Sequence, residues 1–480
     1  MRAVLNTVCC GLAASALILT ASAQEPVKLV RLNVVAVDAQ GKPVGDLAAS
    51  DFHISDEGKA ETIALFHSGG FGPATAAHPG EFTNRPSPPP HTTVILFDFM
   101  NHLRSEWLYA AKKLGTSLKQ VPDASSIYFY VLTTAGQIDP IHPFPSAPGA
   151  APDKTWNQGI EAMLTKEIKG MKTRPTGLTD EDVTKRSYVA LETLGKQLAM
   201  FPGRRDIVWV LGGVPWTYKE NTKNPCNGIW VGCGLYAEHL SFTLDAAGTI
   251  VNLLTYTDLD TNKTADMEAM AQLTGGTVTY GNKGGEIDQV IQQLNESASA
   301  AYVIAYDPGG WDGKFHLDKI ACDRKGVKLI AKTRYLALPD SRDADKRQMD
   351  ALGFAFAGPY DLSDVGLRAT IAPGKTPGTV KIDLRVDLSD LMLQESGGKY
   401  TAHLRVLVSP RSAGGPEGEP KDSSLDPQLT KEQHDAYLKD GFPIPNEVTI
   451  DSSTTSVRLV VGDRVTDWVG SLTIPVAPPK

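Results

Sequence analysis

The stretch Thr92–Arg104, TTVILFDFMNHLR, constrains the fold of this chain more than any other. Val94–Phe97 is an unbroken apolar run that ends at Asp98. A run bounded in this way is typical of a strand buried on both faces, as in a parallel sheet. Apolar residues then recur at helical spacing, at Trp107, Ala110 or Ala111, Leu114 and Leu118. The stretch therefore predicts a buried strand, a polar loop carrying one acid, and an amphipathic helix.

Strand-like and helix-like segments alternate from Thr93 to about Leu336, a pattern typical of a sheet with crossover helices. The expected strands are Ile127–Thr133, which forms a hairpin with Gln137–His142, then Ile207–Leu211, Thr249–Tyr256 and Thr277–Tyr280, with Tyr302–Tyr306, Lys314–Ala321 and Val327–Leu336 closing the domain. The expected helices are Trp156–Lys169, Ser187–Phe201, Tyr236–Ala247, Asp266–Leu273 and Glu286–Ser299. We predict a doubly wound, mostly parallel α/β sheet with Asp98 at its carboxyl edge, where open α/β sheets bind ligands.

Two regions of different character flank this domain, as expected for a chain of 480 residues. Residues 24–68 alternate apolar and polar positions around two Gly-containing turns, which predicts a small β module. Residues 69–91 are rich in Pro and Gly and are interpreted as a linker. Residues 350–480 contain strand-like segments, one helical segment at Thr430–Leu438 and a polar loop at Ser412–Asp426. They predict an antiparallel β-sandwich.

The first 23 residues have the pattern of a secretory signal peptide. Arg2 precedes the apolar segment Val8–Leu19, and Ala21-Ser22-Ala23 follows as a cleavage site. A retained anchor helix is the alternative, although the apolar part is short for a membrane span. No second stretch is long enough to cross a membrane. We expect a secreted or periplasmic protein with no integral membrane segment after cleavage.

The net charge excludes some classes of partner, and the cysteines indicate whether a disulfide forms. The formal net charge is −8 without a long basic run, which argues against nucleic acid and against an anionic membrane surface as partner. Cys226 and Cys233 lie in one Gly-rich loop, where export favours a disulfide over two free buried thiols. Cys322 is left over and is interpreted as a core strand position.

Several segments in this order resemble the von Willebrand factor A-related proteins of acidobacteria. The most specific match is PGRRDIVWVLGGVP at residues 202–215, and VILFDFMN, MAQLTGGTVTY and RLVVGDRVTDWVGSLTIPV also resemble the family. The resemblance covers nearly the whole chain after residue 23. It implies a von Willebrand A-like domain at residues 92–337 between β modules, and a binding or assembly role more than a known reaction.

The wider superfamily holds a divalent cation at the top of the sheet, with an Asp-x-Ser-x-Ser loop, a distant Thr and a further Asp. A hard cation such as Mg2+ takes oxygen ligands in an octahedron. The resemblance therefore implies Asp98, Asn101 and Thr179 as candidate ligands for Mg2+ or another divalent cation. The match is degenerate, because Met100 and His102 occupy the two Ser positions and Gly212-Gly213 replaces the further Asp. The alternative role for Asp98 is a loop acid near the positive end of the following helix.

Motifs of common enzymes are absent from the sequence. It contains no Gly-x-Ser-x-Gly elbow, no phosphate-binding Gly-x4-Gly-Lys-Ser/Thr loop and no His-Glu-x-x-His motif. No set of acid, base and nucleophile is visible either. We therefore predict a protein that is not an enzyme, and an uncharacterised hydrolase ranks behind both non-enzymatic hypotheses.

The leading hypothesis is a secreted protein that binds another protein or a cell-surface component through the top of the sheet. The predicted contact residues are Asp98, Asn101, His102, Gly213, Trp216 and Trp230. Trp230 is either an exposed anchor or a side chain that packs its own loop. The alternative hypothesis is a structural or assembly component of the cell envelope that acts through its β modules.

Overall fold

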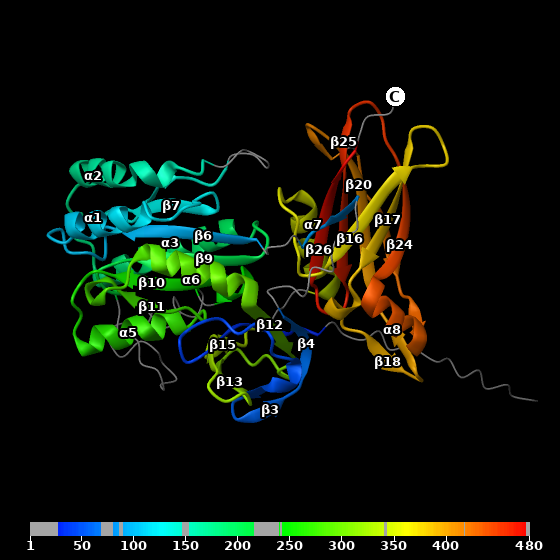
Figure 1. The fold of residues 1–480 in the computed structure, drawn as a ribbon, viewed down its shortest axis with the longest axis horizontal. Coiled ribbons are helices and arrows are strands. Elements are labelled where there is room, and N and C mark those ends of the chain that lie inside the picture. Colours follow the sequence, from blue (N-terminus) through cyan, green and yellow to red (C-terminus); the bar gives the residue numbers. More distant parts are fainter. Residues whose placement is uncertain are drawn as a thin grey trace, which may run out of the picture.

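The computed structural model describes residues 27–68, 80–85, 90–145, 153–215, 240, 242–339, 343–416 and 418–476. Figure 1 shows three parts: an α/β domain, a small β module beside it, and a β-sandwich formed by the C-terminal part of the chain. No helix within the described ranges is long and apolar enough to cross a membrane. The predicted signal peptide, Trp216, Trp230 and the cysteine pair Cys226 and Cys233 lie outside the described residues.

The α/β domain contains a six-stranded sheet in the order β11-β10-β9-β6-β7-β8. Its strands are β6 (His91–Asp98), β7 (Ile127–Leu132), β8 (Ile138–His142), β9 (Arg204–Val210), β10 (Thr249–Thr255) and β11 (Val278–Tyr280). All neighbours pair in parallel except β7 and β8, which form the predicted antiparallel hairpin. The predicted fold class, an α/β domain built on a mostly parallel sheet, is confirmed.

Helices cover both faces of this sheet, which explains the unbroken apolar run of β6. Val94 and Leu96 pack in the core on one face, under α3 (Asp180–Leu198) and α5 (Thr261–Gln272). Ile95 and Phe97 pack in the core on the other face. That face is covered by α1 (Trp107–Leu118), α2 (Ile160–Gly170) and α6 (Ile287–Ala300). Successive strand residues point to opposite faces, so a strand covered twice has no polar face.

The strands predicted to close the α/β domain belong instead to the N-terminal β module. β12 (Ala301–Tyr306) lies between β1 (Val30–Val37) and β4 (Ile63–His67) and is antiparallel to both. Strand β13 pairs with β2 on one side and with β15 on the other, and β14 pairs with β1. These elements are β2 (Phe52–Asp56), β3 (Lys59–Glu61), β13 (Phe315–Cys322), β14 (Lys328–Ile330) and β15 (Arg334–Leu336). The α/β domain is thus inserted between β4 and β12. Our assignment of residues 301–337 to that domain was wrong, because local periodicity does not identify a partner strand more than 200 residues away.

The C-terminal part is the predicted β-sandwich. One sheet has the order β24-β17-β16-β5 and the other β21-β20-β25-β26, with β22 also paired to β20. The strands are β5 (Glu81–Thr83), β16 (Leu367–Pro373), β17 (Thr379–Val386), β20 (Leu404–Ser412), β21 (Gly415–Pro416), β22 (Lys421–Leu425), β24 (Phe442–Thr449), β25 (Thr454–Asp463) and β26 (Val469–Pro475). A small sheet of β18 (Gln394–Ser396), β19 (Lys399–Thr401) and β23 (Gln428–Thr430) and the helices α7 (Ala344–Ala357) and α8 (Lys431–Asp440) complete this part.

Two segments that we predicted to be irregular carry strands of the sandwich. Within the predicted linker 69–91, β5 forms the edge of the first sheet by pairing with β16. The polar loop predicted at Ser412–Asp426 contains β21 and β22, which pair with β20. Both segments are short and polar, so neither has the apolar alternation that identifies a strand in sequence.

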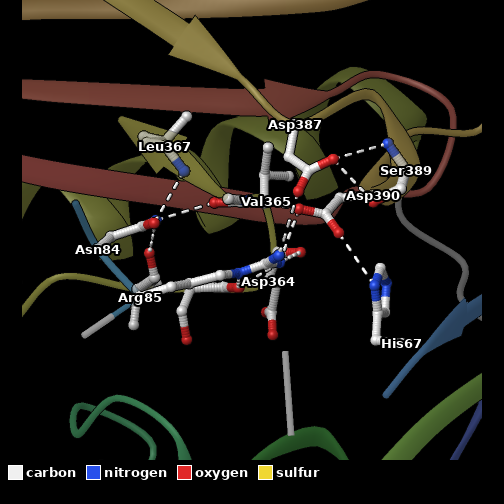
Figure 2. Close-up of polar contacts among 12 residues, drawn as sticks. His67, Asn84, Arg85, Asp364, Val365, Leu367, Asp387, Ser389 and Asp390 are labelled. Atoms are coloured by element: carbon white, nitrogen blue, oxygen red, sulfur yellow. Dashed lines mark hydrogen bonds and ion pairs between the residues drawn. The ribbon is translucent and has the colours of Figure 1, made fainter. Parts of the chain in front are cut away.

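A buried cluster of polar side chains lies where β4 of the N-terminal module meets the sandwich (Figure 2). Arg85, directly after β5, places its Nη2 atom 2.6 Å from Oδ2 of Asp390, whose side chain is fully buried. The same guanidinium donates to the carbonyl of Ser363 at 3.0 Å from Nη2. His67 of β4 approaches the other carboxylate oxygen of Asp390, with Nδ1 at 3.1 Å. Arg85 and Asp390 both belong to the sandwich, and His67 is the side chain through which the N-terminal module reaches this buried pair.

Candidate functional site at the carboxyl edge of the sheet

Asp98 is the last residue of β6, which lies between β7 and β9 in the middle of the sheet. Its position at the carboxyl edge agrees with the sequence prediction. Its side chain, however, is fully buried and not exposed to solvent. Asp98 therefore cannot itself contact a partner, and its assignment to the binding surface was wrong.

Four donors surround the carboxylate of Asp98. Oδ1 accepts hydrogen bonds from the backbone N–H groups of Met100, at 2.7 Å, and Asn101, at 2.9 Å. Oδ2 accepts from the side-chain amide of Asn101 at 2.5 Å and from the indole N–H of Trp209 at 2.9 Å. Trp209 reaches this point from β9, the neighbouring parallel strand. The negative charge is thus balanced by dipoles, and none of the four donors is a cationic side chain.

Burial raises the pKa of Asp98 to about 6, and the hydrogen bonds from Asn101, Trp209 and Met100 limit the rise. At neutral pH the group is therefore mainly a carboxylate. This charge state fits the geometry, because a protonated carboxyl would bring a proton against one of four donors that already face it.

The side chain of His102 fixes the loop at residues 99–106 against the end of β6. The ring of His102 donates from Nδ1 to the carbonyl of Asp98 at 2.7 Å and stacks on Phe97, with the ring centroids 5.5 Å apart. Burial lowers the pKa of His102 to about 4, so the ring is neutral at physiological pH. His102 is 7 % exposed and so does not belong to the binding surface that we predicted.

The glycine pair after β9 permits the close approach of this loop. The backbone N–H of Gly212 donates to the carbonyl of Asn101 at 3.1 Å. A Cβ atom on Gly212 would lie 2.9 Å from that oxygen and 3.1 Å from Cα of His102, too close for any side chain. The glycine that stands where the superfamily has an Asp therefore serves backbone packing between two loops. Gly213 is partly exposed at the same edge.

The predicted ligands do not fit a divalent cation. Mg2+ requires several oxygen ligands in an octahedron, and both oxygens of Asp98 already accept hydrogen bonds. The amide nitrogen of Asn101 points at Asp98 and also donates to Oγ of Ser187 at 2.9 Å. Thr179 is exposed and caps α3, with Oγ1 hydrogen-bonded to Asp182. Within the described ranges, no group of three or more His, Cys, Asp or Glu side chains could hold a metal ion.

Exposed apolar side chains at this edge were not predicted from the sequence. Leu103 is 67 % exposed, Leu108 60 % and Tyr109 51 %, and in the described part of the chain no other large hydrophobic residue is as exposed. We call these three residues the edge patch. Leu103 lies in the loop that Asp98 organises, and the other two lie in the first turn of α1. The signal was present in the sequence, since both helical residues fall off the apolar stripe that starts at Trp107.

Comparisons with known proteins show only distant likeness. No protein-family model matches the chain, and no curated protein matches it. Solved structures with some likeness include the human COPII-coat protein Sec24c, with 12 % identity over 58 % of this chain and 50 % of that chain and a TM-score of 0.28. A von Willebrand factor type A protein from Catenulispora acidiphila is 8 % identical, over 96 % of this chain and 75 % of that chain, with a TM-score of 0.28. The pilus adhesin SpaC from Lactobacillus rhamnosus GG is 10 % identical, over 86 % of this chain and 57 % of that chain, with a TM-score of 0.23.

This chain therefore spans about half the length of Sec24c. Likeness at this level says nothing about the partners or the activity of this chain. The resemblance to the acidobacterial family stays a prediction from the sequence segments.

Proposed function

We propose that this protein binds another protein or a cell-surface component through the edge patch, and that it does so without a metal ion. The observation that carries the proposal is the exposure of Leu103, Leu108 and Tyr109 within seven residues at the carboxyl edge. Exposed apolar residues that cluster mark interaction sites more often than scattered ones. Tyrosine also anchors interfaces well, because it buries a large area and orders few rotatable bonds.

The packing beneath the edge patch supports a preformed surface. The indole N–H of Trp107 donates to the carbonyl of His102 at 3.3 Å, and the ring of Trp107 packs edge-on against Phe99. These contacts and the four hydrogen bonds to Asp98 fix the backbone on both sides of Leu103. A surface that is ordered before binding loses less conformational entropy when the partner arrives.

The remaining features of the proposal rest on sequence alone. We propose that the chain is exported through cleavage after Ala23, that Cys226 and Cys233 form a disulfide, and that the protein is not an enzyme. An assembly role through the β modules is the alternative function. The two functions differ in the surface that makes the contact.

The test is a pull-down from envelope and secreted fractions with chelator present. The test variant combines Leu103→Ser, Leu108→Ser and Tyr109→Ser. The matched control combines Val189→Ser and Leu438→Ser, which remove exposed apolar side chains on α3 and α8. We expect the wild type and the control to retain a common partner and the test variant to lose it. Retention by all three proteins would contradict the proposal and move the contact to the β modules. A partner that disappears with chelator would contradict its metal independence.

A further inference from the structure

Two cationic side chains flank the edge patch. Arg104 follows Leu103 directly, and Lys112 lies one helical turn after Leu108 on α1. Both are exposed. Arg104 forms no ion pair with a residue that the structure describes, whereas Lys112 adds to the effect of Lys119 in lowering the pKa of Glu161 on α2. The guanidinium of Arg104 lies 5.4 Å from the ring centroid of Trp107, which holds it beside the patch.

Other lysines of α1 and its end behave differently. Lys113 pairs with Glu286 of the neighbouring segment at 3.2 Å, and Lys119 pairs with Glu161 of α2 at 2.7 Å. The nearest acid in sequence, Glu106, accepts a hydrogen bond from Thr257 at 3.0 Å. Within the described ranges, Arg104 in the loop before α1 is therefore a cation without an acidic partner beside the exposed apolar side chains, and Lys112 shares Glu161 with Lys119.

We propose that the partner presents an acidic protein segment, in which apolar side chains are flanked by Asp or Glu. This inference rests on the proposed function, because it names the chemistry of the partner at the same surface. The apolar side chains of the segment would cover Leu103, Leu108 and Tyr109, and its carboxylates would pair with Arg104 and Lys112. Arginine binds carboxylates through two parallel hydrogen bonds, which gives orientation as well as attraction.

An anionic lipid surface is the other partner that apolar and cationic groups together could suit. The protein segment is favoured because the chain carries a formal net charge of −8. A broad anionic bilayer would repel much of such a protein, whereas a short acidic segment meets only the cationic edge of the patch.

The experiment is selection of a random peptide library displayed on phage against the purified full chain, followed by binding measurements on the enriched peptides. The variants are the triple variant Leu103→Ser/Leu108→Ser/Tyr109→Ser, the charge reversal Arg104→Glu/Lys112→Glu, and the control Lys399→Glu in β19. Vesicles containing phosphatidylglycerol are tested by co-sedimentation in parallel.

We expect enriched peptides that combine Leu, Phe or Trp with Asp or Glu. Binding of these peptides should be lost in the triple variant, at least about tenfold weaker in the charge reversal, and unchanged in the control. Added salt should weaken it.

Each other outcome overturns the inference in a distinguishable way. Peptides that need the edge patch but are neutral or basic would refute the acidic partner and leave the proposed function intact. Peptides that bind the triple variant as well as the wild type would refute both. Failure to enrich any peptide, or binding to vesicles that the charge reversal abolishes, would also refute the acidic protein segment.

Discussion

Asp98 and Asp390 are both fully buried aspartates, and they are stabilised in opposite ways. Asp98 accepts hydrogen bonds from backbone, amide and indole N–H groups. Asp390 faces the guanidinium of Arg85 at 2.6 Å and also accepts from the backbone N–H of Gly366 at 2.6 Å. The first arrangement shapes a short local loop, whereas the second joins two parts of the molecule that are distant in sequence.

The comparison shows what each kind of stabilisation does. Burial raises the pKa of Asp98 to about 6 and that of Asp390 to about 7. Hydrogen bonds from neighbouring N–H groups limit the rise in the pKa of Asp98. At Asp390 the full positive charge of Arg85 limits the rise. Uncharged hydrogen-bond donors therefore suffice to fix a loop, and at Asp390 a charged partner ties the segment that ends β5 to the rest of the sandwich.

Removing the charged partner should have the largest effect on stability. Arg85→Ala leaves the carboxylate of Asp390 buried without its cation, which typically costs about 3–5 kcal/mol. Urea denaturation followed by tryptophan fluorescence measures the loss. The control is Arg405→Ala, which breaks a more exposed pair with Asp422 and should cost about 1 kcal/mol or less. Equal losses in the two variants would contradict the distinction.

Removing an uncharged hydrogen-bond donor from the carboxylate of Asp98 should have the next largest effect on stability. Asn101→Ala removes one donor to the carboxylate of Asp98 and should cost about 1.5–3 kcal/mol. Asn101→Asp places a second carboxylate beside the first. At pH 8 this variant should therefore be less stable than Asn101→Ala, and at pH 5 it should be more stable than Asn101→Ala. Denaturation with and without MgCl2 separates the alternatives. Restoration of the Asp variant by Mg2+ would indicate a cation site at this edge.

Titration of Asp98 should change stability over a defined pH range. Its pKa in the folded protein, about 6, lies above the ordinary value of 3.8, so the folded state holds more protons between these values. The contribution of Asp98 to the free energy of unfolding therefore falls as the pH rises from about 4 to about 6, by at most about 3 kcal/mol. The measurement is the difference between wild type and Asp98→Asn as a function of pH. A difference that grows toward pH 6 would refute the assignment.

The edge patch should contribute least to stability. Leu108→Ser removes a side chain that is 60 % exposed, so the free energy of unfolding should change by about 0.5 kcal/mol or less. Leu114→Ser, six residues further along the same helix, is the matched buried change and should destabilise by about 2 kcal/mol or more. Thermal unfolding of both variants checks this. A large loss for Leu108→Ser would mean that it packs within the fold.

Local patterns predicted much of the α/β domain. The apolar run before Asp98 predicted β6, and the helical spacing after it predicted α1, because burial on two faces or on one helical face leaves a local period whatever the partner is. The pairing of β12 with β1 and β4 could not be predicted in this way. It joins residues from opposite ends of an inserted domain, and no local period encodes the partner.

The candidate site was predicted in position but not in character. An acid at a strand end was expected to face solvent, whereas Trp209 from the adjacent strand and Asn101 from the following loop enclose it. That enclosure depends on the register of β6 and β9, which the sequence does not specify. Arg85 was likewise assigned to a linker, because its Pro-rich surroundings resemble solvent-exposed chain.

The central claim is that the carboxyl edge is a preformed binding surface that needs no cation. Calorimetric titration of the purified protein with Mg2+, Mn2+ and Ca2+, together with amide hydrogen exchange at residues 98–106, tests it most directly. We expect no saturable heat, and we expect these amides to be protected to the same extent with and without cation. Saturable binding of one ion per chain, with protection of residues 98–106 that appears only when the ion is present, would contradict it.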